Sequence, residues 1–396
     1  MQEFDKVGVV GLGTMGAGIA EVFARAGFQV WGVEVDGDAL ERGRGHVRRS
    51  LSKAVEKGKL SADEQSGILG RISFTTDREE LRDADFVVEA VPERMDLKRE
   101  VFADLDRICP PGTILATNTS SLSVTEIAAL TERPDKVVGL HFFNPAPVMK
   151  LTEVVGTISS APATVAIAAE VAKRIGKTPV AVTDRAGFVA NALLVPFIND
   201  AISVYERRIA SREEIDNAVT KDADLPMGPL TLADLVGVDV CLAVMDVLWE
   251  EFRTPRYAAA PLLRRMVSAG RLGRKSGRGF YDHTGAQDPA EELPTGPLAQ
   301  AVRAGSFGFD LAAMLLVPHV NDALRMVGDG YASAQDIDTA MRFGCGYPKG
   351  PIELFEERGL PWFGAVLEAP IPARLTTATA APVLLAMEVS GQQRLR

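Results

Sequence analysis

Residues suited to acid–base chemistry stand in the segment LHFFNPAPVMKLTEV, residues 140–154. His141 lies twelve positions before Glu153. An imidazole titrates near neutral pH, and a carboxylate on its second nitrogen fixes the tautomer and stabilises the imidazolium. The two prolines between them predict a turn that returns Glu153 towards His141. The spacing equally fits a histidine that ends a strand and a solvated glutamate. The apolar neighbours Leu151 and Val154 favour a buried glutamate, which needs a partner.

A glycine-rich turn near the N-terminus is a second candidate site. The stretch KVGVVGLGTMGAGIAEVFARAGFQVWGVEVD, residues 6–36, reads as strand, turn, helix and strand, with the pattern G-x-G-x-x-G. Backbone N–H groups of such a turn, and the dipole of the helix that follows, bind a pyrophosphate. Glu34 would accept hydrogen bonds from a ribose 2′-hydroxyl and repel a 2′-phosphate, which favours NAD over NADP. The same pattern would serve FAD. The residues predicted to line the cofactor here are Gly11, Leu12, Gly13, Thr14, Met15 and Gly16.

Further strands and helices alternate along the first half of the chain, which predicts a doubly wound parallel (Rossmann) sheet. The expected strands are 84–91, 113–118 and 137–143, with a helix at 97–108. Ligands of such sheets bind at the carboxyl ends of the strands. Polar residues gather at these ends: Glu89, Glu93, the run Asn118-Thr119-Ser120-Ser121, His141 and Asn144.

Composition bounds the class of protein. The 396 residues exceed one ordinary core, and the formal net charge of -10 argues against a general nucleic-acid binder. Three scattered cysteines make no disulfide framework, and no apolar run is long enough to cross a bilayer. We therefore expect a cytoplasmic protein with no membrane and no nucleic-acid partner. No H-x-x-H, cysteine pair or acidic cluster predicts a metal site.

After residue 185 the pattern becomes helical and contains an internal repeat. Residues 193–237 match 315–359 at a constant offset of 122, without a gap. Ser211 and Glu214 predict a capping box, and Pro196 is expected to kink or divide its helix. We read two copies of one all-α domain. The expected boundaries are an N-terminal domain 1–183, copy 1 at 184–283, a linker 284–300, a shorter copy 2 at 301–369, and a loosely attached tail 370–396.

Six motifs together resemble the NAD-dependent (S)-3-hydroxyacyl-CoA dehydrogenases, of the 3-hydroxybutyryl-CoA and 3-hydroxyadipyl-CoA dehydrogenase type. They are GLGTMGAGIA, ATNTSSLSV, GLHFFNPAPVMKLTEVV, DRAGFVANALLVPF, MGPLTLADLVGVD and GRKSGRGFY. The resemblance covers residues 5–282 continuously, with the repeat as a shorter second match. It implies a Rossmann NAD-binding domain followed by two all-α, 6-phosphogluconate-dehydrogenase-like domains. It also implies reversible oxidation of (S)-3-hydroxyacyl-CoA to 3-oxoacyl-CoA with NAD.

The resemblance also implies residue roles. His141 and Glu153 would be the catalytic pair, with Ser120 and Asn191 holding the substrate oxygens. Cofactor contacts would add Glu34, Glu93, Lys98, Ser120, Asn144 and Lys275 to the glycine turn, and coenzyme A would contact Ser50, Lys57 and Ser120. Each position also has an ordinary structural interpretation. Ser120 suits a turn and Asn191 a satisfied core amide. Glu93 with Lys98 suits a surface helix start, Lys275 a basic helix end, and residues 48–59 an exposed charged face.

The second copy is expected to be structural. At the offset of 122, Asn191 corresponds to Ala313, and no glycine turn precedes copy 2. We expect the two copies to form an internal pseudo-dimer, in a chain that is itself a monomer or a homodimer. Two other functions remain open: a β-hydroxyacid dehydrogenase acting on a substrate without coenzyme A, and a non-catalytic, crystallin-like NAD-binding protein.

Overall fold

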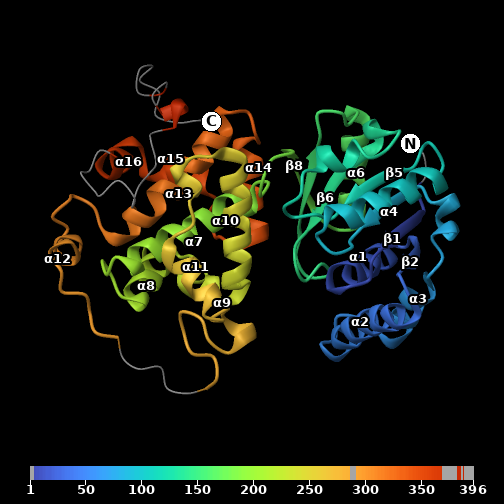
Figure 1. The fold of residues 1–396 in the computed structure, drawn as a ribbon, viewed down its shortest axis with the longest axis horizontal. Helices are drawn as coiled ribbons and strands as arrows, with labels where there is room; N and C mark the ends of the chain where they lie inside the picture. The colour runs from blue at the N-terminus through green and yellow to red at the C-terminus, as the bar shows by residue number, and fades with distance from the viewer. Residues whose placement is uncertain (1–3, 286–290, 368–380, 385–386, 388–396) are drawn as a thin grey trace. The chain divides into compact units, whose positions relative to one another are not determined.

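The structure is a computed structural model that describes residues 4–285, 291–367, 381–384 and 387. The chain divides into two compact units, Met1–Phe188 and Val189–Arg396 (Figure 1). The first is built on a sheet and the second is helical. The predicted fold class is therefore confirmed.

An eight-stranded sheet forms the first unit, in the order β3-β2-β1-β4-β5-β6-β7-β8. Neighbouring strands are parallel except β6 and β7, which are antiparallel. The central strands are rich in buried Val and Ile, as expected for strands covered on both faces. The strands are β1 (Lys6–Val10), β2 (Gln29–Val33), β3 (Ile72–Thr75), β4 (Phe86–Glu89), β5 (Ile114–Thr117), β6 (Val137–Phe142), β7 (Leu151–Gly156) and β8 (Thr178–Thr183).

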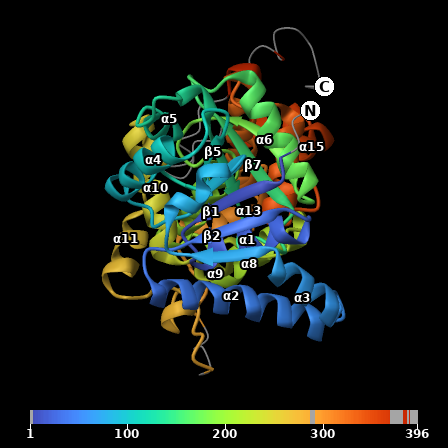
Figure 2. The same cartoon turned by 90° about the vertical axis from the view of Figure 1, so that its right-hand side faces the viewer.

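Helices cover both faces of this sheet, each over its own apolar cluster. Phe23 of α1 and Ala168 of α6 belong to one cluster, whereas Phe102 of α4 and Ile127 of α5 belong to the other. Figure 2 shows α4 and α5 on one side of the strands and α6 on the other. The helices are α1 (Thr14–Arg25), α2 (Gly37–Glu56), α3 (Ala62–Gly70), α4 (Met95–Ile108), α5 (Val124–Ala128) and α6 (Pro162–Arg174), with 3-10 turns η1 (Arg78–Asp83) and η2 (Pro134–Lys136).

The second unit is mainly helical in its described residues, with isolated β-bridges between residues 273 and 282. Its helices are α7 (Ala190–Glu206), α8 (Arg212–Asp222), α9 (Pro229–Val236), α10 (Val238–Phe252), α11 (Pro261–Ser268), α12 (Pro297–Arg303), α13 (Leu311–Gly328), α14 (Ala334–Cys345), α15 (Pro351–Arg358) and α16 (Leu360–Leu367), with 3-10 turns η3 (Pro255–Tyr257) and η4 (Arg274–Ser276).

Local signals explain several helix ends in this unit. The predicted capping box of Ser211 and Glu214 is present. Pro196 does not divide α7, which runs through it. The helical stretch after residue 229 is instead divided at Gly237, whose φ of 110° lies in the region that favours glycine.

The sequence repeat is a structural repeat. At the offset of 122, helices α7 to α10 correspond to α13 to α16, and α7 packs against α13. Single hydrogen bonds repeat as well. Asp216 Oδ1 accepts from the Leu230 amide at 2.8 Å, and Asp338 Oδ1 accepts from the Ile352 amide at 2.8 Å. The predicted duplication is therefore confirmed.

The segment expected to be a loosely attached tail belongs partly to this repeat. Residues 381–384 and 387 are described, and Ala381, Leu384 and Met387 are buried. The Ala381 amide donates to Asn321 Oδ1 at 2.8 Å, as the Ala260 amide donates to Asn199 Oδ1 at 2.8 Å. For these residues the expectation of loose attachment is wrong. The sequence AAPVLLAM (380–387) matches AAPLLRRM (259–266) at an offset of 121, a signal that a search at 122 alone misses. The rest of that tail, and residues 286–290 of the expected linker, lie outside the described residues.

One buried guanidinium links the two copies. Arg256 donates to Asp200 Oδ1 on α7 at 2.6 Å and to Asp322 Oδ2 on α13 at 2.8 Å. The two aspartates are repeat equivalents, and all three side chains are buried. Burial raises the pKa of Asp200 to about 6 even beside this charge. Two buried carboxylates thus share one cation at the junction of the copies.

Removing residues 298–396 tests whether copy 2 covers copy 1. The truncation would uncover the apolar face of α7 that packs on α13, and would take Asp322 from Arg256. We expect the shortened chain to dimerise or aggregate, measured by size-exclusion chromatography with light scattering against the full chain. A shortened chain that stays monomeric, soluble and active would contradict the internal pseudo-dimer.

Candidate active site

His141 and Glu153 face each other across the antiparallel strands β6 and β7. They are register partners, and Nδ1 of His141 lies 2.7 Å from Oε2 of Glu153. Side chains directly opposite in such a pair lie on one face of the sheet. Glu153 is fully buried, and the imidazole packs against the rings of Phe143 and Phe188. A carboxylate only accepts, so Nδ1 donates and the neutral ring keeps its lone pair on Nε2.

The loop between these strands is held by a residue that the sequence did not single out. Nζ of Lys177 donates to the carbonyls of Ala146 and Met149, at 2.5 and 2.7 Å. Burial, with the positive charge of Arg25, lowers the pKa of Lys177 to about 8. No short-range pattern could have indicated Lys177, because its partners lie about thirty residues earlier in the chain.

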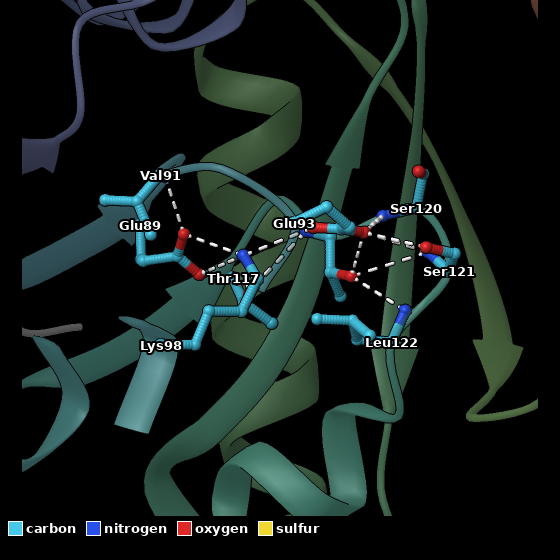
Figure 3. A network of polar contacts seen from close by, with 9 residues as sticks. Glu89, Val91, Glu93, Lys98, Thr117, Ser120, Ser121 and Leu122 are labelled. Carbon is cyan, nitrogen blue, oxygen red and sulfur yellow. Dashed lines mark hydrogen bonds and ion pairs between the residues drawn. The ribbon is translucent and has the colours of Figure 1, made fainter. Parts of the chain in front are cut away.

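A buried ion pair lies at the carboxyl ends of β4 and β5 (Figure 3). Nζ of Lys98, from α4, donates to both carboxylate oxygens of Glu89 at 2.8 Å. Glu89 also accepts from the hydroxyl of Thr117 at 2.7 Å and from the amide of Val91 at 2.7 Å. Both charged side chains are almost completely buried, at 1% and 0% exposure. Every bond to Glu89 comes from a donor, so the carboxylate is held in one position by partners just after β4, on β5 and on α4.

Glu93 connects this pair to the turn that contains Ser120. Its Oε2 lies 3.4 Å from Lys98 Nζ, and its Oε1 accepts from the Ser120 amide at 2.9 Å and the Ser121 amide at 3.1 Å. The hydroxyl of Thr119 donates to the same oxygen at 2.5 Å. Burial raises the pKa of Glu93, but the charge of Lys98 and these hydrogen bonds outweigh burial and lower it. The Ser120 turn is therefore organised around an ionised carboxylate.

The burial of Lys98 contradicts one of the two interpretations of this residue. The surface helix start is wrong, because its ammonium is enclosed by Glu89 and Glu93 at 1% exposure. A contact between Lys98 and the cofactor stays a prediction. Glu89 was visible in the sequence only as a polar residue at a strand end, and Thr117 was not singled out.

The glycine turn is shaped for a close approach of backbone. Gly11 has a φ of 87°, and a Cβ added to Gly16 would lie 1.8 Å from the carbonyl oxygen of Gly11. A Cβ on Gly13 would meet nothing within 4 Å, and this N-cap of α1 offers no side-chain cap to the helix amides. The turn lines a cavity of about 650 Å³ together with Glu34, whose Oε1 accepts from the Leu12 amide at 2.6 Å. An anionic pyrophosphate therefore fits this turn.

A second cavity, of about 510 Å³, lies between α1, α2 and the loop that follows β6. It brings together Ser50, Lys57, Thr14 and Asn144, which the sequence assigned to coenzyme A and to the cofactor. Its cations are Arg25, Arg49, Lys53, Lys57 and Lys59. The carboxylate of Glu21 is buried in its wall beside Arg25. The excess of positive charge suits a phosphorylated ligand.

Two predicted site residues lie in the second unit. Asn191 is the second residue of α7 and is half-buried. Lys275 lies in the 3-10 turn η4, is exposed, and forms an ion pair with Asp239. This ion pair supports neither interpretation of Lys275 over the other.

Comparison with known proteins identifies the family. Residues 6–185 match the family described as 3-hydroxyacyl-CoA dehydrogenase, NAD binding domain. Residues 187–283 and 308–392 match the 3-hydroxyacyl-CoA dehydrogenase C-terminal domain. The chain belongs to the 3-hydroxyacyl-CoA dehydrogenase family. It is accordingly an NAD-dependent oxidoreductase that acts on 3-hydroxyacyl-CoA, and the predicted resemblance is confirmed.

Relatives of this dehydrogenase differ in how much of the chain they match. A 3-hydroxybutyryl-CoA dehydrogenase of Clostridioides difficile is 48% identical over 70% of this chain and 99% of its own length. A 3-hydroxyadipyl-CoA dehydrogenase of Escherichia coli is 35% identical over 87% of this chain and 89% of its own. The crystal structure of an E. coli 3-hydroxybutyryl-CoA dehydrogenase superposes with a TM-score of 0.89, at 32% identity, over 98% of this chain and 99% of its own. The tandem helical arrangement is thus shared with a solved relative.

Within the described ranges, no group of three or more His, Cys, Asp or Glu side chains could hold a metal ion. Over the same part of the chain, no helix has the length and apolar character needed to span a bilayer.

Lys98→Met tests the buried network of the dehydrogenase. The change leaves the carboxylates of Glu89 and Glu93 without their cation, so we expect the free energy of unfolding to fall by about 3–5 kcal/mol. Lys173→Met is the matched control, because Lys173 pairs with Glu170 on the surface, where such pairs contribute less than about 1 kcal/mol. Urea denaturation measures both. Equal small effects would contradict a structural role for Lys98.

Proposed function

We propose that this dehydrogenase oxidises (S)-3-hydroxybutyryl-CoA, or a similar short- or medium-chain (S)-3-hydroxyacyl-CoA, reversibly to the 3-oxoacyl-CoA. The observation that carries the proposal is the His141–Glu153 pair, at 2.7 Å, near the carboxyl end of β6. The names of the C. difficile and E. coli relatives support the acyl-CoA class.

The chain's own groups carry the proton chemistry in this proposal. His141 takes the hydroxyl proton of the substrate on Nε2, and Glu153 stabilises the imidazolium through Nδ1. In the reverse direction the imidazolium returns the proton. When bound, NAD accepts the hydride from the carbon that bears the hydroxyl group. Ser120 and Asn191 hold the reacting oxygen and stabilise the charge that develops on it.

In this proposal the cofactor binds at the carboxyl ends of the strands. The amides of the glycine turn hold the pyrophosphate, and Glu34 exchanges its bond to the Leu12 amide for the adenosine ribose. Glu93 and Asn144 lie on the nicotinamide side. Lys98 contributes through Glu93, whose position sets that of the Ser120 turn. Lys275 remains a proposed contact from the helical unit.

Coenzyme A binding in the proposal uses the cationic cavity at α2. Ser50 and Lys57 hold its polar groups, and the neighbouring cations balance its phosphates. This cavity argues against a substrate without coenzyme A. The buried His141–Glu153 pair argues against a non-catalytic NAD-binding protein, since an orienting carboxylate has no use there.

NADH formation measures the proposed activity directly. The substrates are (S)-3-hydroxybutyryl-CoA, longer (S)-3-hydroxyacyl-CoAs, 3-hydroxyadipyl-CoA and free 3-hydroxybutyrate. We expect turnover on a short or medium acyl-CoA and none on the free acid. His141→Asn should lower kcat by about 100- to 10,000-fold, because the base is lost. Glu153→Gln should lower it by about 100-fold or more, because the tautomer is no longer fixed.

The control for both variants is the dissociation constant for NADH, measured by fluorescence titration. It should stay near the wild-type value. Absence of turnover on every acyl-CoA would overturn the proposal. Full activity of His141→Asn would overturn the role of the pair alone.

Lys57→Glu tests the coenzyme A cavity. Loss of one charge-assisted contact, with a reversed charge, should raise the KM for acyl-CoA by about tenfold and leave kcat nearly unchanged. Lys136→Glu, a change of the same charge outside this cavity, serves as the control. Unchanged KM for Lys57→Glu would place coenzyme A elsewhere.

A further inference from the structure

The loop that joins β6 to β7, residues 143–150, forms part of the cavity of about 510 Å³ in which coenzyme A is proposed to bind. Residues 144–148 of this loop all line that cavity, opposite the cations of α2. A loop lacks the hydrogen-bond ladder of a strand, so its position depends on the contacts that other elements make with it. Those contacts therefore decide the shape of this wall.

One side of the loop packs closely on α1. A Cβ added to Gly18 of α1 would lie 3.1 Å from Cδ of Pro147 and 3.2 Å from Cβ of Ala146. The glycine thus lets the loop approach the helix more closely than a larger residue would. Such apolar contact does not satisfy the peptide groups of the loop, which need polar partners elsewhere.

Lys177, between α6 and β8, supplies a partner for two of these peptide groups. Its Nζ donates to the carbonyls of Ala146 and Met149, at 2.5 and 2.7 Å, and the residue is 9% exposed. The next residue fixes the backbone at this point, because the Thr178 amide donates to the carbonyl of Lys150 at 2.7 Å. A buried ammonium on a fixed segment therefore holds two points of the loop at once.

The charge of Lys177 is held less firmly than that of a surface lysine. Burial, with the positive charge of Arg25 on α1, lowers the pKa of Lys177 to about 8, and the carboxylate of Glu21 on α1 opposes this shift. Burial raises the pKa of Glu21 as well, although its partner Arg25 lowers it. Lys177 is thus an ammonium near pH 7 and loses its proton above about pH 8, where its bonds to the two carbonyls lose their charge assistance.

We propose that Lys177 is a positioning residue for acyl-CoA, because its two hydrogen bonds hold residues 144–148 in place as a wall of the coenzyme A cavity. The inference rests on the proposed function, which assigns this cavity to coenzyme A. Lys177 binds the loop and does not line the cavity itself. Its loss should therefore weaken binding of acyl-CoA and leave the base His141 in place, since the strand register of β6 and β7 holds that residue.

Isothermal titration calorimetry of the full chain with (S)-3-hydroxybutyryl-CoA, without NAD, measures this affinity apart from turnover. Lys177→Met removes the ammonium and keeps an unbranched side chain. We expect its dissociation constant at pH 7 to be about tenfold above the wild-type value, because two loop carbonyls lose their donor. In NADH formation, KM should rise in parallel and kcat should stay within about threefold. Lys173→Met, which loses a surface lysine paired with Glu170, is the control for the change of charge and should bind as wild type does.

The pH profile separates positioning from a general loss of structure. As Lys177 loses its proton, the wild-type dissociation constant should rise by about threefold between about pH 7 and pH 9. Lys177→Arg keeps its charge over this range, so its dissociation constant should stay constant, within about threefold of the wild-type value at pH 7. Lys177→Met should bind weakly at both pH values.

Circular dichroism checks the fold of each variant. If Lys177→Met does not fold, the profiles of wild type and Lys177→Arg decide. Equal affinity of Lys177→Met and wild type, or a wild-type affinity that is constant from about pH 7 to pH 9, would overturn the role of Lys177 alone. Absence of NADH formation by wild type would instead overturn the proposed function, and calorimetry would still decide the role of Lys177. Absence of binding to wild type would overturn both.

Discussion

A buried charge must have a partner, and this constraint organises both units of the dehydrogenase. Glu153 is fully buried and meets His141; Glu89 is fully buried and meets Lys98. In the helical unit Arg256 is shared by Asp200 and Asp322. The first two pairs join consecutive elements, β6 with β7 and β4 with α4, and the third joins helices of the two copies, so the pairing also sets how those elements pack. The proposed catalytic groups depend on two of the three pairs.

Lys98 takes no part in the proposed chemical step, but it positions residues near the proposed site. Lys98 satisfies Glu89 at the end of β4 and orients Glu93, and Glu93 binds the amides of the Ser120 turn. The position of the turn is thereby set by Glu93 and by the buried pair of Lys98 and Glu89 next to it. Thr117, at the end of β5, adds a second strand end to the same support.

The two copies of the helical domain share a fold but not the proposed site residue. Both copies keep the interactions that maintain the fold, such as Asp216 with Leu230 and Asp338 with Ile352. They differ where function is proposed, since copy 1 has Asn191 where copy 2 has Ala313. Arg256 donates to an aspartate of each copy, so the two copies do not form a symmetric pair.

Local patterns in the sequence were sufficient for the strand–turn–helix at Gly11–Gly16, the alternation of strands and helices and the capping box at Ser211, because each depends on neighbours in the chain. The repeat was found by comparing the chain with itself, because both copies keep the residues that maintain one fold. Motifs were likewise sufficient for the family. The tertiary structure alone decided that Lys98 is buried rather than exposed, that Lys177 holds the loop after β6, and that residues 381–384 join the repeat. It also decided that His141 and Glu153 lie in register, since spacing permitted the pair but did not require it. The physical reason is common to all of these cases. The free energy of a buried charge or polar group depends on which partner reaches it through space, and neither composition nor periodicity contains that information.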